Sequence, residues 1–250
     1  MLIKITDKCS MGCSHCLSDC TPNLCDMELN TFIDTMNFYD KYCRNILKPI
    51  FISGGEPTES SIFMDVIRYL IDNNYSEIPI IITTNGLWLT KNEWLAEELE
   101  KFLPNCSFQV VVDDRYYPIH VNENSPVFNH DNVVLCHDVI AIYPQGRALN
   151  NNLPFQVKAS KCFNIRAITK QKIGASLSDI FQAMGLCAKF CTPHIDIDGN
   201  IKLGESRLCP ICSNIYKTEA EIINDIIAFQ CHQCDFLNNN LPDLYKVFVE

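Results

Sequence analysis

The sequence predicts an α/β protein: a partial (β/α)6 TIM-like barrel over residues 1–150, followed by a small cysteine-rich C-terminal domain over residues 151–250. In the first 145 residues, short β-branched runs alternate with segments of helical periodicity. Strands separated by helices must pair in parallel through crossover connections. After Asn150 to Asn152, a predicted linker, the pattern changes to short elements with closely spaced cysteines.

The expected barrel strands are short and apolar, and amphipathic helices separate the first four of them. The predicted strands span residues 2–6, 49–53, 78–83, 108–112, 133–135 and 139–143. Asp26 is expected to cap the first helix, and Ile62 begins the apolar face of the second. Thr90 to Glu93 has the form of a capping box for the third helix. In such barrels the loops that follow the strands meet at one mouth, where the chemistry takes place.

The composition disfavours several classes of protein. A hydrophobic content of 47% over 250 residues is enough for a sizeable core and excludes a disordered chain. No stretch reaches the ~20 apolar residues of a membrane span, and no secretory leader is visible, so we expect a cytoplasmic protein. The net charge of −10 disfavours a nucleic-acid partner.

The 15 cysteines indicate either a disulfide framework or a set of metal ligands. Their odd number, the missing leader and the close spacing of several groups favour metal. The first group, Cys9-x3-Cys13-x2-Cys16, follows the first predicted strand. Three thiolates on one tight loop can bind three irons of a [4Fe-4S] cluster and leave the fourth iron open. The spacing alone leaves a zinc loop as the alternative.

Two further motifs follow the next two strands: a GGEP segment begins at Gly54 and a TTNG segment at Thr83. Together with the cysteine loop, these motifs resemble the radical S-adenosylmethionine superfamily. The resemblance implies that Cys9, Cys13 and Cys16 hold a catalytic [4Fe-4S] cluster that cleaves S-adenosylmethionine to start radical chemistry. The cofactor-binding residues that the resemblance implies are His15, Gly54, Gly55, Glu56, Pro57, Thr84, Asn85, Asp113 and Arg147.

The resemblance also implies what the GGEP and TTNG residues do. Gly54 and Gly55 let the backbone approach the methionyl group, and Glu56 offers a carboxylate to its ammonium. Thr84 and Asn85 are expected near the ribose and the carboxylate of the cofactor.

Three other positions carry weaker expectations. His15 stands where many members have an aromatic residue that stacks near adenine, and an imidazole can partly replace such a ring. Asp113 follows the fourth strand, where the family often has a polar residue aimed at the cofactor. Arg147 lies in a PQGRA segment similar to the family's PxGRA, and is expected to hold a cofactor carboxylate or a substrate anion, with a surface arginine as the alternative.

The C-terminal region resembles the twitch domain, the short relative of the SPASM domain, which carries an auxiliary [4Fe-4S] cluster. The resemblance implies metal ligands among Cys187, Cys191, Cys209, Cys212, Cys231 and Cys234. Gly204 stands where the family usually has a cysteine, so the ligand set stays open. A structural zinc site is the alternative, because four thiolates can hold either metal. Most of the remaining cysteines are expected to be buried free thiols; they are Cys20, Cys25, Cys43, Cys106, Cys136 and Cys162.

The resemblance implies a cleavage of S-adenosylmethionine that yields a 5′-deoxyadenosyl radical, which abstracts a hydrogen atom from the substrate. We expect oxidative modification or cross-linking of a ribosomally made peptide, because the auxiliary domain and the PxGRA segment are common among peptide maturases. Oxidation of a small molecule such as an aminocyclitol or sugar is the first alternative, and a non-catalytic zinc or electron-transfer protein is the second. The expected electron donor is a flavodoxin or ferredoxin.

Overall fold

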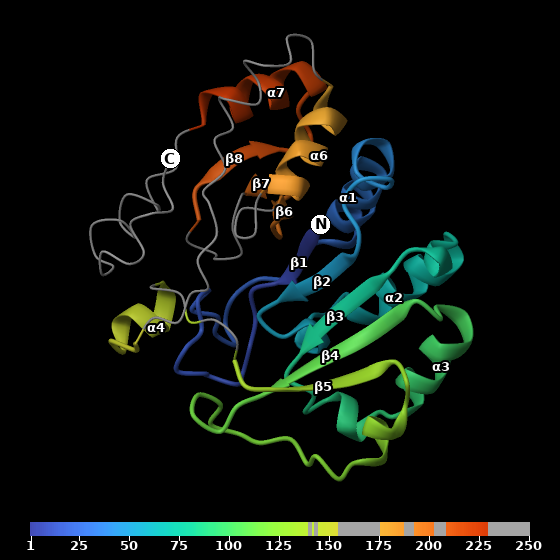
Figure 1. The fold of residues 1–250 in the computed structure, drawn as a ribbon, viewed down its shortest axis with the longest axis vertical. Coiled ribbons are helices and arrows are strands. Elements are labelled where there is room, and N and C mark those ends of the chain that lie inside the picture. Colours follow the sequence, from blue (N-terminus) through green and yellow to red (C-terminus); the bar gives the residue numbers. More distant parts are fainter. Residues whose placement is uncertain (140–141, 143–144, 155–175, 188–192, 203–208, 230–250) are drawn as a thin grey trace.

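The computed structural model describes residues 1–139, 142, 145–154, 176–187, 193–202 and 209–229, with only the backbone over 183–187. Its centre is one sheet with the strand order β5-β4-β3-β2-β1-β6-β7-β8 (Figure 1). The first five strands are β1 (Leu2–Thr6), β2 (Ile50–Gly54), β3 (Ile80–Thr84), β4 (Cys106–Val112) and β5 (Val133–His137). Each pairs in parallel with its neighbour, as the sequence predicts. The sixth predicted strand, at 139–143, falls largely outside the described residues.

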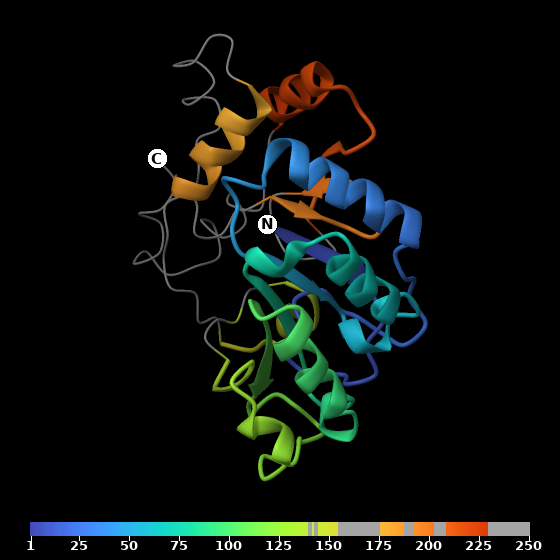
Figure 2. The ribbon, with the colours of Figure 1, turned by 90° about the vertical axis from the view of Figure 1, so that its right-hand side faces the viewer.

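Helices connect these parallel strands and form a layer along the sheet (Figure 2). They are α1 (Leu29–Tyr42), α2 (Phe63–Asp72) and α3 (Trp94–Phe102). Short 3-10 turns are η1 (Pro57–Glu59), η2 (Tyr75–Glu77), η3 (Leu89–Lys91) and η4 (Pro126–Asn129). The core lies between the layers, where apolar side chains from the sheet, such as Ile52 and Phe108, are fully buried with Phe32 of α1. The α/β class and the parallel arrangement are therefore confirmed.

The described part of the C-terminal region continues the same sheet. Strand β6 (His194–Ile195) pairs in parallel with β1, and β7 (Asn200–Lys202) and β8 (Ile211–Asn214) follow in antiparallel order. Helices α6 (Leu177–Cys187) and α7 (Glu219–Ala228) accompany them, whereas the short helix α4 (Gly146–Asn150) lies against the loop after β1. A domain boundary near residue 150 stays a prediction, although these strands extend the first sheet rather than forming a second one. No helix in the described ranges is both long and apolar enough to cross a membrane.

Two of the predicted helix caps are wrong. Helix α3 begins at Trp94, and Thr90 lies inside η3, where its hydroxyl donates to the carbonyl oxygen of Leu87 at 3.1 Å instead of closing a capping box. Helix α1 begins at Leu29 after Glu28, whose side chain makes no capping bond, so Asp26 is too early to act as the cap.

Asp26 instead joins three separate segments. Its carboxylate accepts from the Thr6 hydroxyl at 2.7 Å, from Lys8 Nζ at 2.6 Å and from the Ser61 hydroxyl at 2.8 Å. Burial acts to raise the pKa of Asp26, but these hydrogen bonds outweigh it and lower the pKa to about 2. The ionised carboxylate therefore stabilises the junction between β1, the following loop and the start of α2.

Replacing Asp26 with asparagine is expected to lower the free energy of unfolding at pH 7 by about 1 to 2 kcal/mol. Because the folded pKa is depressed, this stabilisation is present above the ordinary value of 3.8 and is lost as the pH falls through about 2. Urea denaturation of both proteins at a series of pH values measures the difference, with Asp34→Asn on the exposed face of α1 as the control. A difference that stays constant down to the acid range would contradict this role.

Candidate active site

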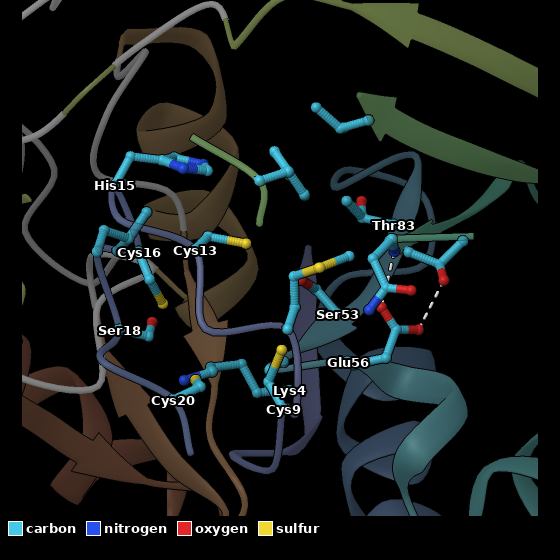
Figure 3. Close-up of a pocket in the computed structure, with 18 of the residues that line it drawn as sticks. Lys4, Cys9, Cys13, His15, Cys16, Ser18, Cys20, Ser53, Glu56 and Thr83 are labelled. Carbon is cyan, nitrogen blue, oxygen red and sulfur yellow. Dashed lines mark hydrogen bonds between the residues drawn. The ribbon is translucent and has the colours of Figure 1, made fainter. Parts of the chain in front are cut away.

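One cavity of about 210 Å³ lies beside the carboxyl ends of β1 to β4 (Figure 3). Most of the predicted site residues line it: Cys9, Cys13, His15, Cys16, Gly54, Gly55, Glu56, Thr84 and Asn85. Segments far apart in the sequence thus meet because the loops of neighbouring parallel strands leave the sheet at the same edge. Pro57 is buried at the start of η1, while Asp113 and Arg147 are outside this lining.

The cysteine loop follows β1 and is attached to the loop after β2. The Gly55 backbone N–H donates to the Thr6 carbonyl oxygen at 2.9 Å, and the Glu56 N–H donates to that of Lys8 at 2.7 Å. A Cβ on Gly55 would lie 2.0 Å from the Lys8 carbonyl oxygen, so only glycine permits this approach. The second glycine of the GGEP segment therefore fixes where the cysteine loop begins.

The thiols of Cys9, Cys13 and Cys16 are free and half-buried, and all three residues line the cavity, with Cys9 apart from Cys13 and Cys16 (Figure 3). Burial raises the pKa of Cys9 to about 11 and that of Cys13 to about 12, so a metal bound by these thiols would have to displace their protons. The described residues contain no group of three side chains arranged around a single metal ion. Cubane thiolates bind different irons and need not converge on one point, so three thiols around one cavity fit an iron–sulfur cluster.

Cys20 is a residue of the site that the sequence prediction missed. It lines the cavity, is 1% exposed and forms a hydrogen bond with Cys16 through its side chain. This bond, together with the backbone N–H groups of Cys20 and Ser18, lowers the pKa of Cys16. The CxxxC spacing from Cys16 to Cys20 was the available signal, and it extends the first motif by one cysteine.

Glu56 organises the neighbouring loop. Its Oε1 accepts from the hydroxyls of Thr58 at 2.7 Å and Thr84 at 2.6 Å, and its Oε2 accepts from the Asn85 backbone N–H at 2.7 Å. The carboxyl group is fully buried, and the loss of solvent raises its pKa. The GGEP and TTNG motifs therefore form one hydrogen-bonded unit, and a cation beside Glu56 would stabilise the ionised form.

His15 lies among aromatic residues. Its ring centroid is 5.2 Å from that of Tyr116 and 5.3 Å from that of Tyr117, and its ring is tilted by 48° and 45° relative to the two tyrosine rings. Burial lowers the pKa of His15, so the neutral imidazole is favoured. Tyr117 also lines the cavity, and the sequence offered no signal for it beyond its place after the fourth strand. The histidine ring thus faces the cavity as part of an aromatic group.

Asp113 and Arg147 are occupied by contacts within the protein. Arg115 donates to both oxygens of Asp113, at 2.8 and 2.6 Å, and the Val139 N–H donates at 2.7 Å. The bond from Arg115 holds the pKa of Asp113 well below its usual range. Arg147 donates to Asp19 and to carbonyl oxygens of the cysteine loop. Their predicted roles as cofactor ligands stay predictions. In the structure, both side chains hold segments of the protein together.

The side chains of most C-terminal cysteines lie outside the described part of the chain. Cys191, Cys231 and Cys234 lie outside the described residues, and of Cys187 only its backbone position at the end of α6 is described. Cys212 is buried within β8, and Cys209 lies just before that strand. The auxiliary ligand set therefore stays a prediction.

No family model and no curated protein matches this sequence. Among solved structures, the chain is similar to BtrN in complex with AdoMet and 2-DOIA, with a TM-score of 0.59 at 14% identity over 98% of this chain and 91% of that one. It is also similar to native anSMEcpe with bound AdoMet and the Cp18Cys peptide, with a TM-score of 0.51 at 14% identity over 92% and 81% of the two chains. The chain therefore shares the TIM-like α/β fold of these two structures.

Proposed function

We propose that this protein is a radical S-adenosylmethionine enzyme. The observation that carries the proposal is the meeting of the three-cysteine loop, the Gly54–Pro57 segment and the Thr83–Gly86 segment at one cavity. The fold supports it, since the two solved structures named above contain bound AdoMet. A zinc-binding or electron-transfer protein would have no need of the glycine and glutamate loops beside its thiols.

In this proposal Cys9, Cys13 and Cys16 hold three irons of a [4Fe-4S] cluster and leave the fourth open. When bound, the cluster supplies the electron that cleaves S-adenosylmethionine into methionine and a 5′-deoxyadenosyl radical. A flavodoxin or ferredoxin is the proposed source of that electron.

The loop residues of this chain position the methionyl end of the cofactor. Glu56 Oε1 accepts from Thr58 and Thr84, whereas its Oε2 accepts from the Asn85 N–H and keeps acceptor capacity for an ammonium group. Burial of the carboxyl group strengthens such a charge-assisted bond, because little water competes for it. His15 and Tyr117 provide an aromatic wall on which an adenine can pack.

Two substrate classes follow from different observations. The PQGRA segment and the cysteine-rich C-terminal region support the oxidative modification or cross-linking of a ribosomally made peptide. The structure with bound 2-DOIA covers this chain over 98% of its length, and this supports oxidation of a small molecule. We put the peptide first, because both sequence features belong to this chain itself.

A second [4Fe-4S] cluster in the C-terminal region would take up the electron that hydrogen abstraction leaves on the substrate. The proposed ligands are drawn from the six cysteines between Cys187 and Cys234. Iron is preferred over zinc, because zinc has no redox function and stabilises the fold only.

The decisive experiment combines the reduced, anaerobically reconstituted protein with S-adenosylmethionine and an extract of the source cells grown on deuterated medium. Formation of 5′-deoxyadenosine, measured by mass spectrometry, tests the reaction class, and no formation would contradict it. Deuterium in that product reports abstraction from a substrate. Transfer that disappears after protease treatment of the extract identifies a peptide, whereas transfer that persists in the low-mass fraction identifies a small molecule.

A further inference from the structure

Helix α4 is bound to the cysteine loop by its backbone and by the side chain of Asn151, the residue after its last turn. The Arg147 N–H donates to the Cys16 carbonyl oxygen at 2.9 Å, and Asn151 Nδ2 donates to that of Ser14 at 2.9 Å. A Cβ on Gly146 would lie 2.5 Å from the Cys16 carbonyl oxygen, and its φ of +55° also favours glycine. The helix therefore lies directly against the loop that carries Cys13 and Cys16.

The guanidinium group of Arg147 contacts both ends of the loop segment from Cys13 to Cys20. Its Nη1 donates to the Cys13 carbonyl oxygen at 3.0 Å, its Nη2 donates to the Cys20 carbonyl oxygen, and its Nε donates to Asp19 Oδ1 at 2.9 Å. The segment from Cys13 to Cys20 belongs to no helix or strand, so its carbonyl groups depend on such partners. The planar fork of arginine suits this task, because it presents several donors in fixed directions.

The charge of Arg147 also acts on the thiols. Its guanidinium group donates to the carbonyl oxygens of Cys13 and Cys20, so its positive charge lies against the loop that carries Cys13 and Cys16. The side chain of Arg147 is 20% exposed, so solvent screens this field only in part. A positive charge at this place favours the more negative, reduced state of any centre that the thiolates hold.

We propose that α4 is a clamp on the cysteine loop and that Arg147 is its positioning residue, which fixes the backbone from Cys13 to Cys20 and raises the reduction potential of the bound cluster. The effect on the reduction potential rests on the proposed function, whereas the role of α4 as a clamp on the loop does not. The task differs from the predicted one of binding a cofactor carboxylate or substrate anion. The guanidinium group donates to backbone carbonyl groups and to the carboxylate of Asp19, and Arg147 does not line the cavity.

Hydrogen–deuterium exchange on the full-length, metal-free protein tests the clamp. In Arg147→Gln and Arg147→Lys, amides of residues 9–20 are expected to exchange about tenfold faster or more, because both variants lose the fork. Amides of β3 and β4 are expected to keep the wild-type rate. Arg68→Gln, an exposed arginine paired with Asp65, is the matched control and is expected to change neither region.

Asn151→Ala gives a milder test that does not depend on the Arg147 variants folding well. It removes only the bond to the Ser14 carbonyl group and is expected to accelerate exchange of the loop about threefold. Wild-type exchange of residues 9–20 in Arg147→Gln or in Asn151→Ala would overturn the clamp. Failure of the wild-type protein to bind iron would refute the proposed function and leave the exchange result standing.

The reduction potential of the reconstituted protein, measured by a redox titration followed by electron paramagnetic resonance, separates charge from geometry. We expect a more negative midpoint in Arg147→Gln, a midpoint close to wild type in Arg147→Lys, and a more positive midpoint in Asp19→Asn. A purely structural role would not produce shifts of opposite sign at Arg147 and Asp19. Equal midpoints in all these proteins would overturn the electrostatic part of the proposal.

Discussion

Replacing Cys9, Cys13 and Cys16 together with alanine is expected to reduce 5′-deoxyadenosine formation from S-adenosylmethionine to background. The three thiols lie around one cavity and supply the protein ligands of the proposed cluster, so no reducing centre remains beside the cofactor. The measurement is mass spectrometry of 5′-deoxyadenosine after anaerobic reconstitution and chemical reduction.

Cys25→Ala is the matched control, because this thiol is exposed and lies outside the cavity lining. It is expected to keep wild-type turnover, whereas undiminished cleavage by the triple variant would contradict the site. Metal analysis of the triple variant also tests the C-terminal proposal. About four irons per chain support a second cubane, and stoichiometric zinc without iron removes the proposed electron acceptor.

Gly55→Val is expected to lower 5′-deoxyadenosine formation about tenfold or more and to lower iron content as well. The sequence alone predicts only an obstructed cofactor with nearly unchanged cluster content. In the structure, however, a Cβ at this position lies 2.0 Å from the Lys8 carbonyl oxygen and 3.0 Å from Cys9 Cβ. Cys9, the first proposed cluster ligand, must therefore move, because the obstacle is backbone that cannot rotate away.

The matched control for this variant is Gly12→Ala, in the same loop. Its φ is +70°, but an added Cβ meets nothing nearer than Arg147 at 3.9 Å, so it introduces backbone strain without a collision. Iron content and calorimetric affinity for S-adenosylmethionine are compared in Gly55→Ala, Gly55→Val and Gly12→Ala. Wild-type iron content and affinity in Gly55→Val would show that the close approach is dispensable.

The local sequence pattern was sufficient to predict the parallel strands and most of the residues that line the cavity. A strand such as Ile80–Thr84 is a continuous apolar run that ends in polar residues, and the parallel order places those ends at one edge. The position of Glu56 beside Asn85 followed from that order as well. The two cap predictions failed because other partners compete for these side chains: the distant Lys8 binds Asp26, and Thr90 donates to the nearby Leu87 carbonyl oxygen within η3.

The remaining features depend on contacts between distant segments. Nothing near Arg147 in the sequence indicates that its partners are carbonyl groups about 130 positions earlier, at Cys13 and Cys20. The pairing of β6 with β1 is equally non-local, so the C-terminal strands were not expected to extend the first sheet. The contact of Lys4 could be predicted in part. A lysine inside an apolar strand needs a buried partner of opposite charge, and in the structure this partner is Asp7, at 2.7 Å.

The central claim is that the cluster held by Cys9, Cys13 and Cys16 keeps one iron open for S-adenosylmethionine. Electron–nuclear double resonance on the reduced protein tests it, using cofactor labelled with ¹⁵N in the amino group and ¹⁷O in the carboxylate. The account predicts direct hyperfine coupling of both labels to the cluster, absent from the triple cysteine variant. A reduced cluster in the wild-type protein that shows no coupling to either label at saturating cofactor would contradict it.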